Sequence, residues 1–426
     1  MGSADTSNIL MIAFHYPPYG SSSGLRRTHC FSRFLPEHDW QPFILTADPR
    51  AYDTVKTEHA RPTVEGEGAV VTRAFALDSI RHLGFRGKYP GFLALPDRWV
   101  SWFPAAVIKG LAIIRKQDVR VIWSTYPIAT AHLIGLCLCR FSGVPWVADF
   151  RDPMIDEVHP TGSMKRKVFR YIEKKTLTHA AGACFTTPGA LKLYQDRYPQ
   201  LDSSRWICIE NGYDEGDFDS VAAPASGQVA AKSHPRPPIT LVHSGTLYPL
   251  ERDPSCFFSV LAQLKATGEI SKGNLRIILR ATGHDNFINN ALKHHQIEDI
   301  VSVEQDLEYS QALQEMCAAD GLLLFQAANC NQQIPAKLYE YLRSARPLLA
   351  LTDPNGDTAK LIERENAGIV ADLHSEESAL QGLKRLIGVI HENEFKPVSQ
   401  QRVRHYSRQQ QAGELADFLN QIVSTQ

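Results

Sequence analysis

The stretch IPAKLYEYL at residues 334–342 lies between two apolar runs, Gly321 to Phe325 and Pro347 to Leu351. Apolar runs of this length predict buried strands. Pro335 suits the first turn of a helix, where its missing N–H costs no hydrogen bond. Within the stretch, Leu, Tyr and Leu recur at i, i+3 and i+4, which indicates one apolar helix face. The stretch therefore predicts a strand–helix–strand unit of a parallel sheet.

The helix of this unit carries a lysine and a glutamate that suit a nucleotide site. Open α/β sheets bind ligands outside the carboxyl ends of their strands, and the positive N-terminal end of a helix favours phosphate. The Glu340 carboxylate can accept two hydrogen bonds from a ribose diol, and the Lys337 ammonium can meet a phosphate. A Lys–Glu pair on a solvated helix face explains the same spacing. The spacing alone leaves both interpretations open.

The composition allows two domains of ordinary size. The chain has 426 residues, of which 43% are hydrophobic, and it contains 45 lysines and arginines and 46 aspartates and glutamates. This balance gives no support for a nucleic-acid partner, which usually requires a basic surface. The eight cysteines show no zinc-binding spacing and are expected to be reduced thiols. With no apolar run long enough for a membrane span and no signal peptide, a cytoplasmic location is expected.

Strands alternate with helices along the whole chain and predict two βα series. The first series lies in residues 1–220 and the second in residues 239–399. Residues 221–238 are rich in Ala, Pro, Ser and Gly without an apolar period, which is typical of a linker. Residues 400–426 predict one further, polar helix. The sequence therefore predicts an α/β protein with two doubly wound domains.

A glycine loop follows the first strand of the second series. Gly245 and Thr246 come directly after the apolar run from Ile239 to His243. A glycine there lets the backbone approach a pyrophosphate, and Arg252 could bind its oxygens through two N–H groups. A tight turn with a surface arginine is the alternative.

Two loops of the first series have a composition that fits a ligand site. A loop of Pro, Gly and Ser follows the first strand and runs from His15 to Gly24. Such a loop before a helix can present backbone amides to an anion, and Arg26 or Arg27 at the start of that helix can face a ligand or solvent. The charged segment Asp149 to Asp152 follows another strand. Charges at that edge of a sheet are costly to bury without a purpose, and a functional role and a self-paired loop both explain them.

Basic and aromatic residues are mixed between Arg81 and Lys116. Such a mixture can lie on an anionic membrane surface. It can equally form a lid on the acceptor side, or helices whose aromatic rings fill the core. We expect the core or the lid, with peripheral membrane contact at the inner face of the plasma membrane as the alternative.

Three elements resemble the GT-B glycosyltransferases, and in particular the retaining glycosyltransferase family 4. They are the stretch at 334–342, the segment Asp149-Phe150-Arg151-Asp152 and the loop Ser-Gly-Thr-Leu-Tyr at 244–248. That family carries a Glu-x(7)-Glu pair whose second glutamate binds the donor ribose, and Glu340 occupies the second position. The first position is Gln332 here, an amide without charge.

The resemblance implies two Rossmann-like domains that face each other across a cleft, with an acceptor-side first domain and a donor-binding second domain. The C-terminal helix is expected to pack back on the first domain. The implied reaction is metal-independent transfer of a sugar, with retention, from a nucleotide-diphosphate sugar to an acceptor hydroxyl, in bacterial surface-glycan or glycoconjugate biosynthesis. No cofactor is expected besides the donor, for which UDP-sugars are favoured over GDP-sugars. The acceptor is expected to be a glycan, a lipid-linked molecule or a small molecule.

The resemblance also assigns roles to residues of this sequence. The catalytic residues are expected to be Arg252, Lys337, Asp149, Arg151 and Asp152. The donor-binding residues are expected to be Gly245, Thr246, Arg252, Gln332, Lys337, Leu338, Glu340, Ser23 and Gly24. The acceptor-side residues are expected to be His15, Ser22, Arg26 and Asp152.

Two other functions stay open. A nucleotide-sugar epimerase of the same fold would need paired carboxylates and a histidine, and the sequence shows no clear set. A non-catalytic partner subunit would keep the fold and bind nucleotide weakly, and Gln332 favours it.

Overall fold

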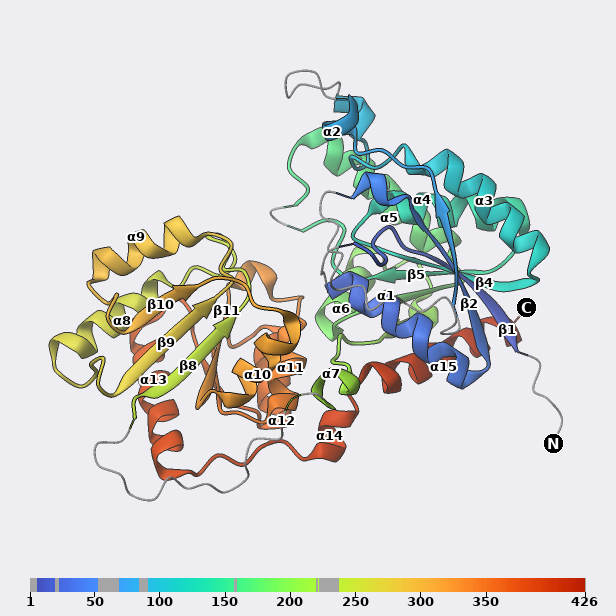
Figure 1. Cartoon of the computed structure of the whole chain (residues 1–426). Helices are drawn as coiled ribbons and strands as arrows, with labels where there is room; N and C mark the ends of the chain where they lie inside the picture. The colour runs from blue at the N-terminus through green and yellow to red at the C-terminus, as the bar shows by residue number, and fades with distance from the viewer. Residues whose placement is uncertain are drawn as a thin grey trace. The chain divides into compact units, whose positions relative to one another are not determined.

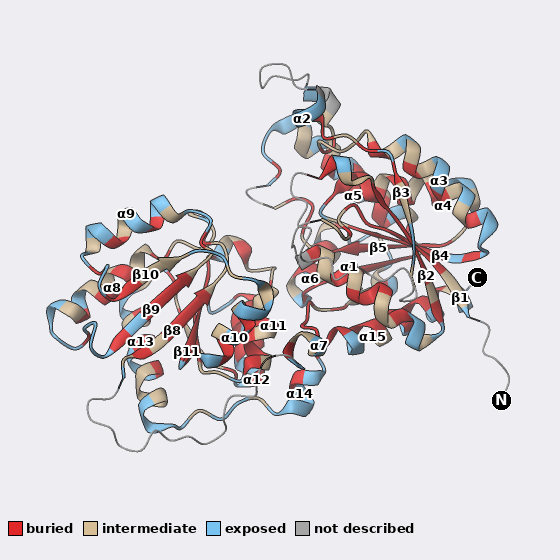
Figure 2. Cartoon of the chain, in the orientation of Figure 1, coloured by how far each residue is buried: buried red, intermediate tan, exposed pale blue. Residues whose placement is uncertain are grey.

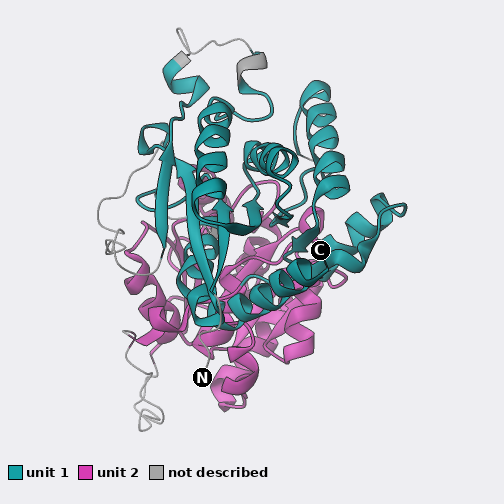
Figure 3. Cartoon of the chain, turned by 90° about the vertical axis from the view of Figure 1, so that its right-hand side faces the viewer, with its two compact units in different colours: residues 1–211, 408–426 teal, residues 212–407 magenta. Residues whose placement is uncertain are grey.

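The computed structural model describes the chain in two compact units (Figure 3). Unit 1 comprises residues 1–211 and 408–426, and unit 2 comprises residues 212–407. Each unit has one parallel β-sheet with helices packed on it (Figure 1). The described residues are 6–19, 23–52, 69–83, 91–156, 159–219, 221 and 237–425.

The sheet of unit 1 has seven strands in the order β3-β2-β1-β4-β5-β6-β7, all paired in parallel. The order changes direction between β1 and β4, so the sheet is doubly wound with its switch point there. The strands are β1 (Ser7–Ile12), β2 (Trp40–Ala47), β3 (Val70–Ala74), β4 (Val119–Thr125), β5 (Trp146–Phe150), β6 (Gly182–Phe185) and β7 (Trp206–Cys208).

Both faces of this sheet are buried. Strands β4 and β5 are coloured mainly as buried (Figure 2). In β1, Leu10 and Ile12 belong to one apolar cluster, and Ile9 and Met11 belong to another on the opposite face. A strand buried on both faces needs a continuous apolar run, which is why the run is readable from the sequence. The helices of unit 1 are α1 (Ser23–Phe34), α2 (Ser79–Leu83), α3 (Trp102–Lys116), α4 (Ala129–Ser142), α5 (Ser163–His179), α6 (Pro188–Arg197) and α15 (Arg408–Ser424).

The sheet of unit 2 repeats this design with six parallel strands in the order β10-β9-β8-β11-β12-β13. Its switch point lies between β8 and β11. The strands are β8 (Ile239–Ser244), β9 (Leu275–Arg280), β10 (Val301–Glu304), β11 (Gly321–Gln326), β12 (Leu348–Thr352) and β13 (Ile369–Ala371). The helices are α7 (Glu215–Asp219), α8 (Ser255–Ala266), α9 (Asp285–His295), α10 (Tyr309–Ala318), α11 (Lys337–Ser344), α12 (Asp357–Glu365), α13 (Glu376–Glu392) and α14 (Gln400–Arg404).

The prediction of two doubly wound α/β domains is confirmed. The expected strand–helix–strand unit is β11, α11 and β12. Pro335 lies two residues before the first helical residue, Lys337, and Ala336 is the N-cap. Short 3₁₀ segments, η1 (Leu35–His38), η2 (Pro49–Ala51), η3 (Gly91–Ala94), η4 (Ser203–Arg205) and η5 (Ala328–Cys330), complete the described elements.

The chain passes from unit 1 to unit 2 at Gly212, ahead of the expected boundary at residue 220. The reason is that Tyr213 and Phe218 pack in an apolar cluster of unit 2. Most of the expected linker, 221–238, lies outside the described residues.

The single helix expected at 400–426 is two helices. α14 belongs to unit 2, and the chain returns to unit 1 at Arg408, where α15 begins. α15 packs against α1, and Trp40 Nε1 donates a hydrogen bond to Asn420 Oδ1 over 3.0 Å. Leu415, Phe418 and Leu419 bury the apolar face of α15 in unit 1.

Three aromatic residues between 81 and 116, Trp99, Trp102 and Phe103, pack in unit 1. Trp102 is fully buried, and Trp99 and Phe103 are half-buried against the same cluster. Phe85 and Tyr89 of the expected membrane-contact region lie outside the described residues. In the described part of the chain, no helix is both long and apolar enough to cross a membrane.

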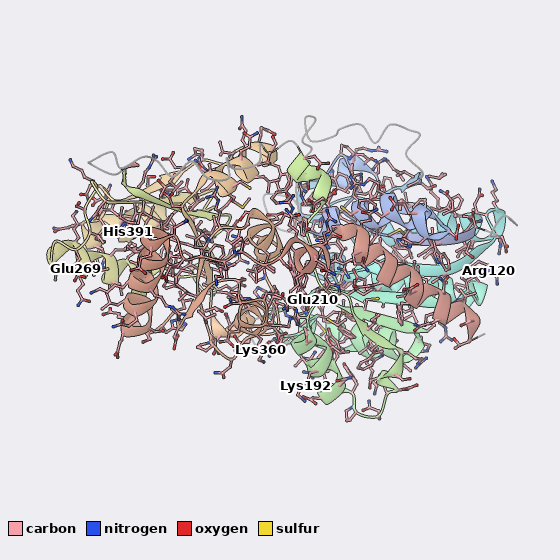
Figure 4. All side chains as sticks on the ribbon, turned by 90° about the horizontal axis from the view of Figure 1, so that it is seen from below. Arg120, Lys192, Glu210, Glu269, Lys360 and His391 are labelled. Atoms are coloured by element: carbon pink, nitrogen blue, oxygen red, sulfur yellow. The ribbon has the colours of Figure 1, made fainter. Side chains whose placement is uncertain are left out.

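Charged side chains lie on the outside of each unit. Arg120 and Lys192 are exposed in unit 1, and Glu269, Lys360 and His391 are exposed in unit 2 (Figure 4). Both signs are represented, in line with the net charge of −1.

Candidate functional site

Two loops meet at the switch point of the sheet in unit 2. One follows β8 and the other follows β11. The Ala327 N–H donates to the Glu251 carbonyl over 2.7 Å, and Asn329 Nδ2 donates to the Leu250 carbonyl over 3.2 Å. These bonds join the two loops outside the carboxyl ends of the central strands, which is where open α/β sheets bind ligands.

Gly245 makes room for the Lys337 side chain at this point. Its φ of +115° is strained for any other residue, and a Cβ on it would lie 2.7 Å from Lys337 Nζ. Lys337 Nζ lies 3.4 Å from Nε2 of His243, a histidine that sequence reasoning missed. The His243 ring is fully buried, and Nδ1 lies 2.9 Å from the Leu323 carbonyl. Burial and the neighbouring Lys337 hold the pKa of His243 well below its usual value, so the ring stays neutral.

The surroundings of Lys337 disfavour the positive charge of its ammonium group. Burial, and then the nearby Arg252 guanidinium, lower the pKa of the Lys337 ammonium to about 7, although Glu340 acts in the opposite direction. An anion bound beside Lys337 would favour its protonated form. Among the described residues, no side chain caps the N-terminus of α11, the helix that Lys337 begins. The position therefore suits a phosphate group.

Arg252 lies on the same loop as Gly245. Its Nη1 donates to the Thr246 carbonyl over 2.9 Å, and its guanidinium lies 5.5 Å from the centre of the Tyr248 ring. A guanidinium has five N–H donors, so these contacts leave capacity for an anion. Arg252 and Lys337 thus form a pair of cations at the switch point.

Glu340 is oriented by a tyrosine from another helix. The Tyr309 hydroxyl of α10 donates to Glu340 Oε1 over 2.8 Å. This bond fixes the carboxylate while its second oxygen can accept further hydrogen bonds. One residue on, the Tyr341 hydroxyl accepts a hydrogen bond from the Ser244 N–H over 3.1 Å, which fixes α11 to the end of β8.

A hollow of about 780 Å³ opens beside this cluster, at the ends of β9 and β10. Its wall approaches the glycine loop at Gly283, where a Cβ would lie 3.1 Å from Thr246 Cγ2. The hollow has the size of a small-molecule site. It is lined by Ala281, Gly283, His284, Asp285, Asn286, Phe287, Glu304, Gln305 and Asp306.

The loop that carries Gln332 is held by buried amides. Gln326 Nε2 donates to the carbonyls of Cys330 and Gln333, each over 3.0 Å, and Asn331 Nδ2 donates to Asp353 over 2.6 Å. Gln332 is half-buried on this loop.

Leu338 does not fit its expected role through its side chain. The side chain is fully buried in an apolar cluster, where no ligand reaches it.

In unit 1, the expected catalytic residue Asp149 is fully buried in an ion pair. Arg27 Nη2 donates to Asp149 Oδ1 over 2.9 Å and Arg27 Nε to Oδ2 over 3.2 Å, and neither side chain is exposed. Thr125 donates a third bond to Oδ2 over 2.8 Å. Arg27 also binds the carbonyls of Ile209 and Glu210. This geometry favours a positioning role for Asp149 over direct contact with substrate.

Arg151 and Gly24 are brought together at the N-terminus of α1. A Cβ on Gly24 would overlap Arg151 Nη1, so only a glycine admits the guanidinium there. Arg151 Nη1 also lies 3.5 Å from the Tyr126 carbonyl, and burial lowers the pKa of Arg151. Asp152, the next residue, is half-buried.

Of the remaining acceptor-side residues, the structure describes His15 and Arg26. His15 is half-buried and its ring stacks on Tyr19 with centroids 4.2 Å apart. Arg26 is half-buried on α1. Ser22 and the side chain of Ser23 lie outside the described residues.

A sequence signal distinguishes the buried Arg27 from Arg26. Arg27 precedes Phe31 by four residues and Phe34 by seven, so it shares the apolar face of α1. Its guanidinium lies 4.8 Å from the centre of the Phe31 ring. For Tyr309 and His243 no comparable signal exists, because their partners come from distant segments.

Gly245→Ala is expected to abolish nucleotide binding and to destabilise unit 2. The new methyl group would meet the Lys337 ammonium, and alanine is strained at a φ of +115°. Thermal unfolding with and without a nucleotide diphosphate measures both effects. Gly268→Ala is the matched control, since this glycine has a φ of +77° but a methyl group there would have no described atom within 4 Å. Equal ligand-induced shifts in both variants would contradict the expected contact.

No protein-family model and no curated protein matches the sequence. Solved structures do match. A glycosyltransferase from Rickettsia africae ESF-5 aligns with a TM-score of 0.65 at 13% identity, covering 99% of this chain and 100% of that chain. Sucrose-phosphate synthase from Thermosynechococcus elongatus aligns with a TM-score of 0.67 at 13% identity, covering 99% and 100%.

HepE of Anabaena, solved in complex with UDP and glucose, aligns with a TM-score of 0.63 at 13% identity, covering 97% of this chain and 99% of that chain. At sequence identities this low, the matches to these structures show the fold alone. The two Rossmann-like domains, with seven and six parallel strands, have the GT-B fold of these solved structures.

Proposed function

We propose that this protein is a glycosyltransferase that moves a sugar from a nucleotide-diphosphate donor to an acceptor hydroxyl. The observation that carries the proposal is the cation pair Lys337 and Arg252 beside Gly245, with Glu340 one helical turn away. Two cations and an oriented carboxylate at one switch point match a diphosphate joined to a ribose.

In this proposal, each part of the donor has its own binding residues. Lys337 and Arg252 bind the diphosphate, and Glu340, held by Tyr309, accepts hydrogen bonds from the ribose hydroxyls. The base then extends toward the hollow at the ends of β9 and β10. We favour a UDP-sugar, since the Anabaena neighbour was solved with UDP and glucose.

The chemistry proposed is retaining and includes no metal ion. The bond between the sugar and the diphosphate breaks, the acceptor oxygen forms the new bond on the same face, and the departing phosphate takes the acceptor proton. Negative charge grows on the diphosphate as its bond breaks. Lys337 and Arg252 stabilise that charge, because they are fixed by the protein before the reaction begins.

The acceptor side is assigned to unit 1. Arg151 and Asp152 follow β5, and His15 follows β1, so all three lie after strands that flank or adjoin the switch point of that sheet. A glycan, a lipid-linked molecule or a small molecule fits this assignment, and the role proposed is bacterial surface-glycan or glycoconjugate biosynthesis. Asp149 supports this region through Arg27.

The test is a thermal-shift and donor-hydrolysis panel with UDP-, GDP- and dTDP-sugars. A ligand that binds only the native state must raise its apparent stability by mass action. We expect one nucleotide class to stabilise the wild type, Glu340→Ala to abolish the shift, and Tyr309→Phe to weaken the affinity about threefold to tenfold. Glu363→Ala, an exposed glutamate of the same unit, is the control and should behave as wild type.

Gln332 supports one second candidate, a non-catalytic partner subunit. An amide at this position brings no charge to the transferred sugar. Nucleotide binding without hydrolysis or transfer to any acceptor would favour that candidate. Absence of any nucleotide shift in the wild type would overturn both.

A further inference from the structure

Helix α5 of unit 1 presents a strongly basic outward face. Its sequence, SMKRKVFRYIEKKTLTH at 163–179, has six lysines and arginines and one acidic residue, Glu173. Glu173 is fully buried, where it accepts hydrogen bonds from Tyr194, Arg197 and Tyr198. The single negative charge of the helix therefore faces the interior, and the outward face carries positive charge without an acidic counterpart on the helix.

Two large apolar side chains lie within this basic face. Met164 is 63% exposed and Tyr171 is 60% exposed. They are seven residues apart, so they lie on the same side of the helix. Exposed Lys167 and Lys174 follow the same seven-residue spacing. Apolar and cationic side chains thus share one stripe along the outward side of α5.

Helix α4 packs against α5, and its C-terminal end adjoins the C-terminal end of α5. Arg140 Nη1 lies 3.3 Å from Nε2 of His179, the last residue of α5. The next residue of α4, Phe141, is 74% exposed. Helix α4 therefore adds one exposed basic and one exposed apolar side chain beside the end of α5. The outward surface of α5 itself, which we call the α5 face, comprises Met164, Lys167, Arg170, Tyr171, Lys174 and Lys175.

The α5 face is held rigidly by the residues beneath it. At the N-terminal end, Arg166 Nη2 donates to the Asp156 carbonyl over 2.7 Å. At the inner side, Arg197 Nη1 donates to Glu173 Oε1 of α5 over 2.9 Å, and Arg197 Nη2 donates to the Ile155 carbonyl over 2.9 Å. Its lysines and aromatic rings are therefore presented on a fixed support.

We propose that the α5 face binds the surface of a membrane that contains anionic lipids. Lysines and arginines are attracted to the negative surface potential of such a membrane, and methionine and tyrosine side chains enter the headgroup region. The proposal goes beyond sugar transfer and does not depend on it. It also lies on a different helix from the region 81–116, whose described aromatic rings Trp99, Trp102 and Phe103 pack in the core.

Charge complementarity alone would also suit a nucleic acid. Exposed Met164 favours the membrane, because a phosphate backbone offers no apolar layer for this side chain, whereas a bilayer does.

Co-sedimentation of the full chain with vesicles tests the proposal. We compare vesicles of phosphatidylcholine alone with vesicles that contain roughly a third phosphatidylglycerol, at low and high salt. We expect binding to the anionic vesicles only, with at least about tenfold weaker binding at high salt, because surface charges are screened.

Two variants separate charge from apolar contact. Lys167→Glu/Lys174→Glu should weaken vesicle binding at least about tenfold, since each basic residue near an anionic surface contributes a few-fold. Met164→Ser/Tyr171→Ser keeps the charge and should weaken binding several-fold. Lys272→Glu/Lys293→Glu changes the same charge at exposed positions of unit 2 and should bind as wild type. All substituted positions are exposed, and circular dichroism checks that each variant is folded.

Several results would overturn the proposal. The first two are equal binding of the wild type to neutral and anionic vesicles, and no binding to either. The third is a loss of vesicle binding in Lys272→Glu/Lys293→Glu as large as in Lys167→Glu/Lys174→Glu. The fourth is binding of an RNA oligonucleotide to the α5 face without vesicle binding. None of these depends on whether a nucleotide sugar binds unit 2, so the proposal and the proposed function fail separately.

Discussion

Lys337→Met is expected to lower sugar transfer by about 100-fold to 1000-fold, the usual effect of removing one preorganised stabilising group. The ammonium lies beside Gly245 and Arg252, and in the proposed mechanism it stabilises the charge that grows on the departing diphosphate. Methionine preserves the length and apolar part of the side chain, so unit 2 should keep its fold. Steady-state transfer and nucleotide titration measure the change. Turnover within about threefold of the wild type would remove Lys337 from the proposed mechanism.

The same residue predicts a pH dependence of donor binding. Burial lowers the pKa of Lys337 from 10.5 to about 7, so in the unliganded protein the ammonium loses its proton as the pH rises through about 7. A bound diphosphate favours the protonated form, and its affinity should therefore fall above pH 7. In the Lys337→Met variant this fall should disappear. Calorimetric titration between pH 6 and about 9 measures it.

The pH dependence of the folding stability has the opposite sign to that of the donor affinity. Between about pH 7 and 10.5 the unfolded chain holds the lysine proton and the folded chain does not. The unfolded state binds more protons, so the free energy of unfolding of the unliganded wild type should rise with pH across this range. The Met variant lacks this contribution. A rise of equal size in both proteins would assign the pH effect to other groups.

Asp149→Ala is expected to destabilise unit 1 by about 3–5 kcal/mol, because it leaves a buried arginine without its counter-charge. Neither Arg27 nor Asp149 is exposed, and two hydrogen bonds of 2.9 and 3.2 Å join them. Urea unfolding measures the loss. Asp196→Ala is the control: Asp196 forms an exposed pair with Lys192, and its loss should cost less than about 1 kcal/mol.

A double variant separates charge burial from packing. Arg27→Met/Asp149→Leu removes both charges and should recover a large part of the stability, since apolar pairs often replace buried ion pairs at little cost. If Asp149→Ala alone is no worse than Asp196→Ala, the ion pair does not hold this part of unit 1.

The order of strands and helices could be predicted from the sequence because parallel strands here are buried on both faces. β11 is fully buried along its length, and its residues alternate between two apolar clusters. Such a strand appears in the sequence as an uninterrupted apolar run. The start of α6 is stabilised by equally local contacts: the Thr187 hydroxyl accepts a hydrogen bond from the Ala190 N–H over 2.9 Å, and Pro188 follows the cap.

Less of the candidate site could be predicted, because its contacts join residues far apart in the chain. Tyr309 reaches Glu340 from 31 residues away, and Arg27 reaches Asp149 from 122 residues away. Residue types and local spacing carry no information about such pairs. The side chain of Leu338 shows the same limit: at i+1 from Lys337 it points to another side of the helix, into the core. The predicted donor-binding role of Leu338 stays a prediction.

The sequence by itself determined the two βα series, the loop that carries Gly245 and the helix that carries Lys337 and Glu340, because hydrophobic periods and turn residues act over a few positions. Only the tertiary structure decided which charges are buried, which are paired and which are left for a ligand. It placed Asp149 in an ion pair and Lys337 beside a second cation, Arg252. The free energy of a charge depends on the surroundings that folding assembles, and that environment is not written in any local stretch.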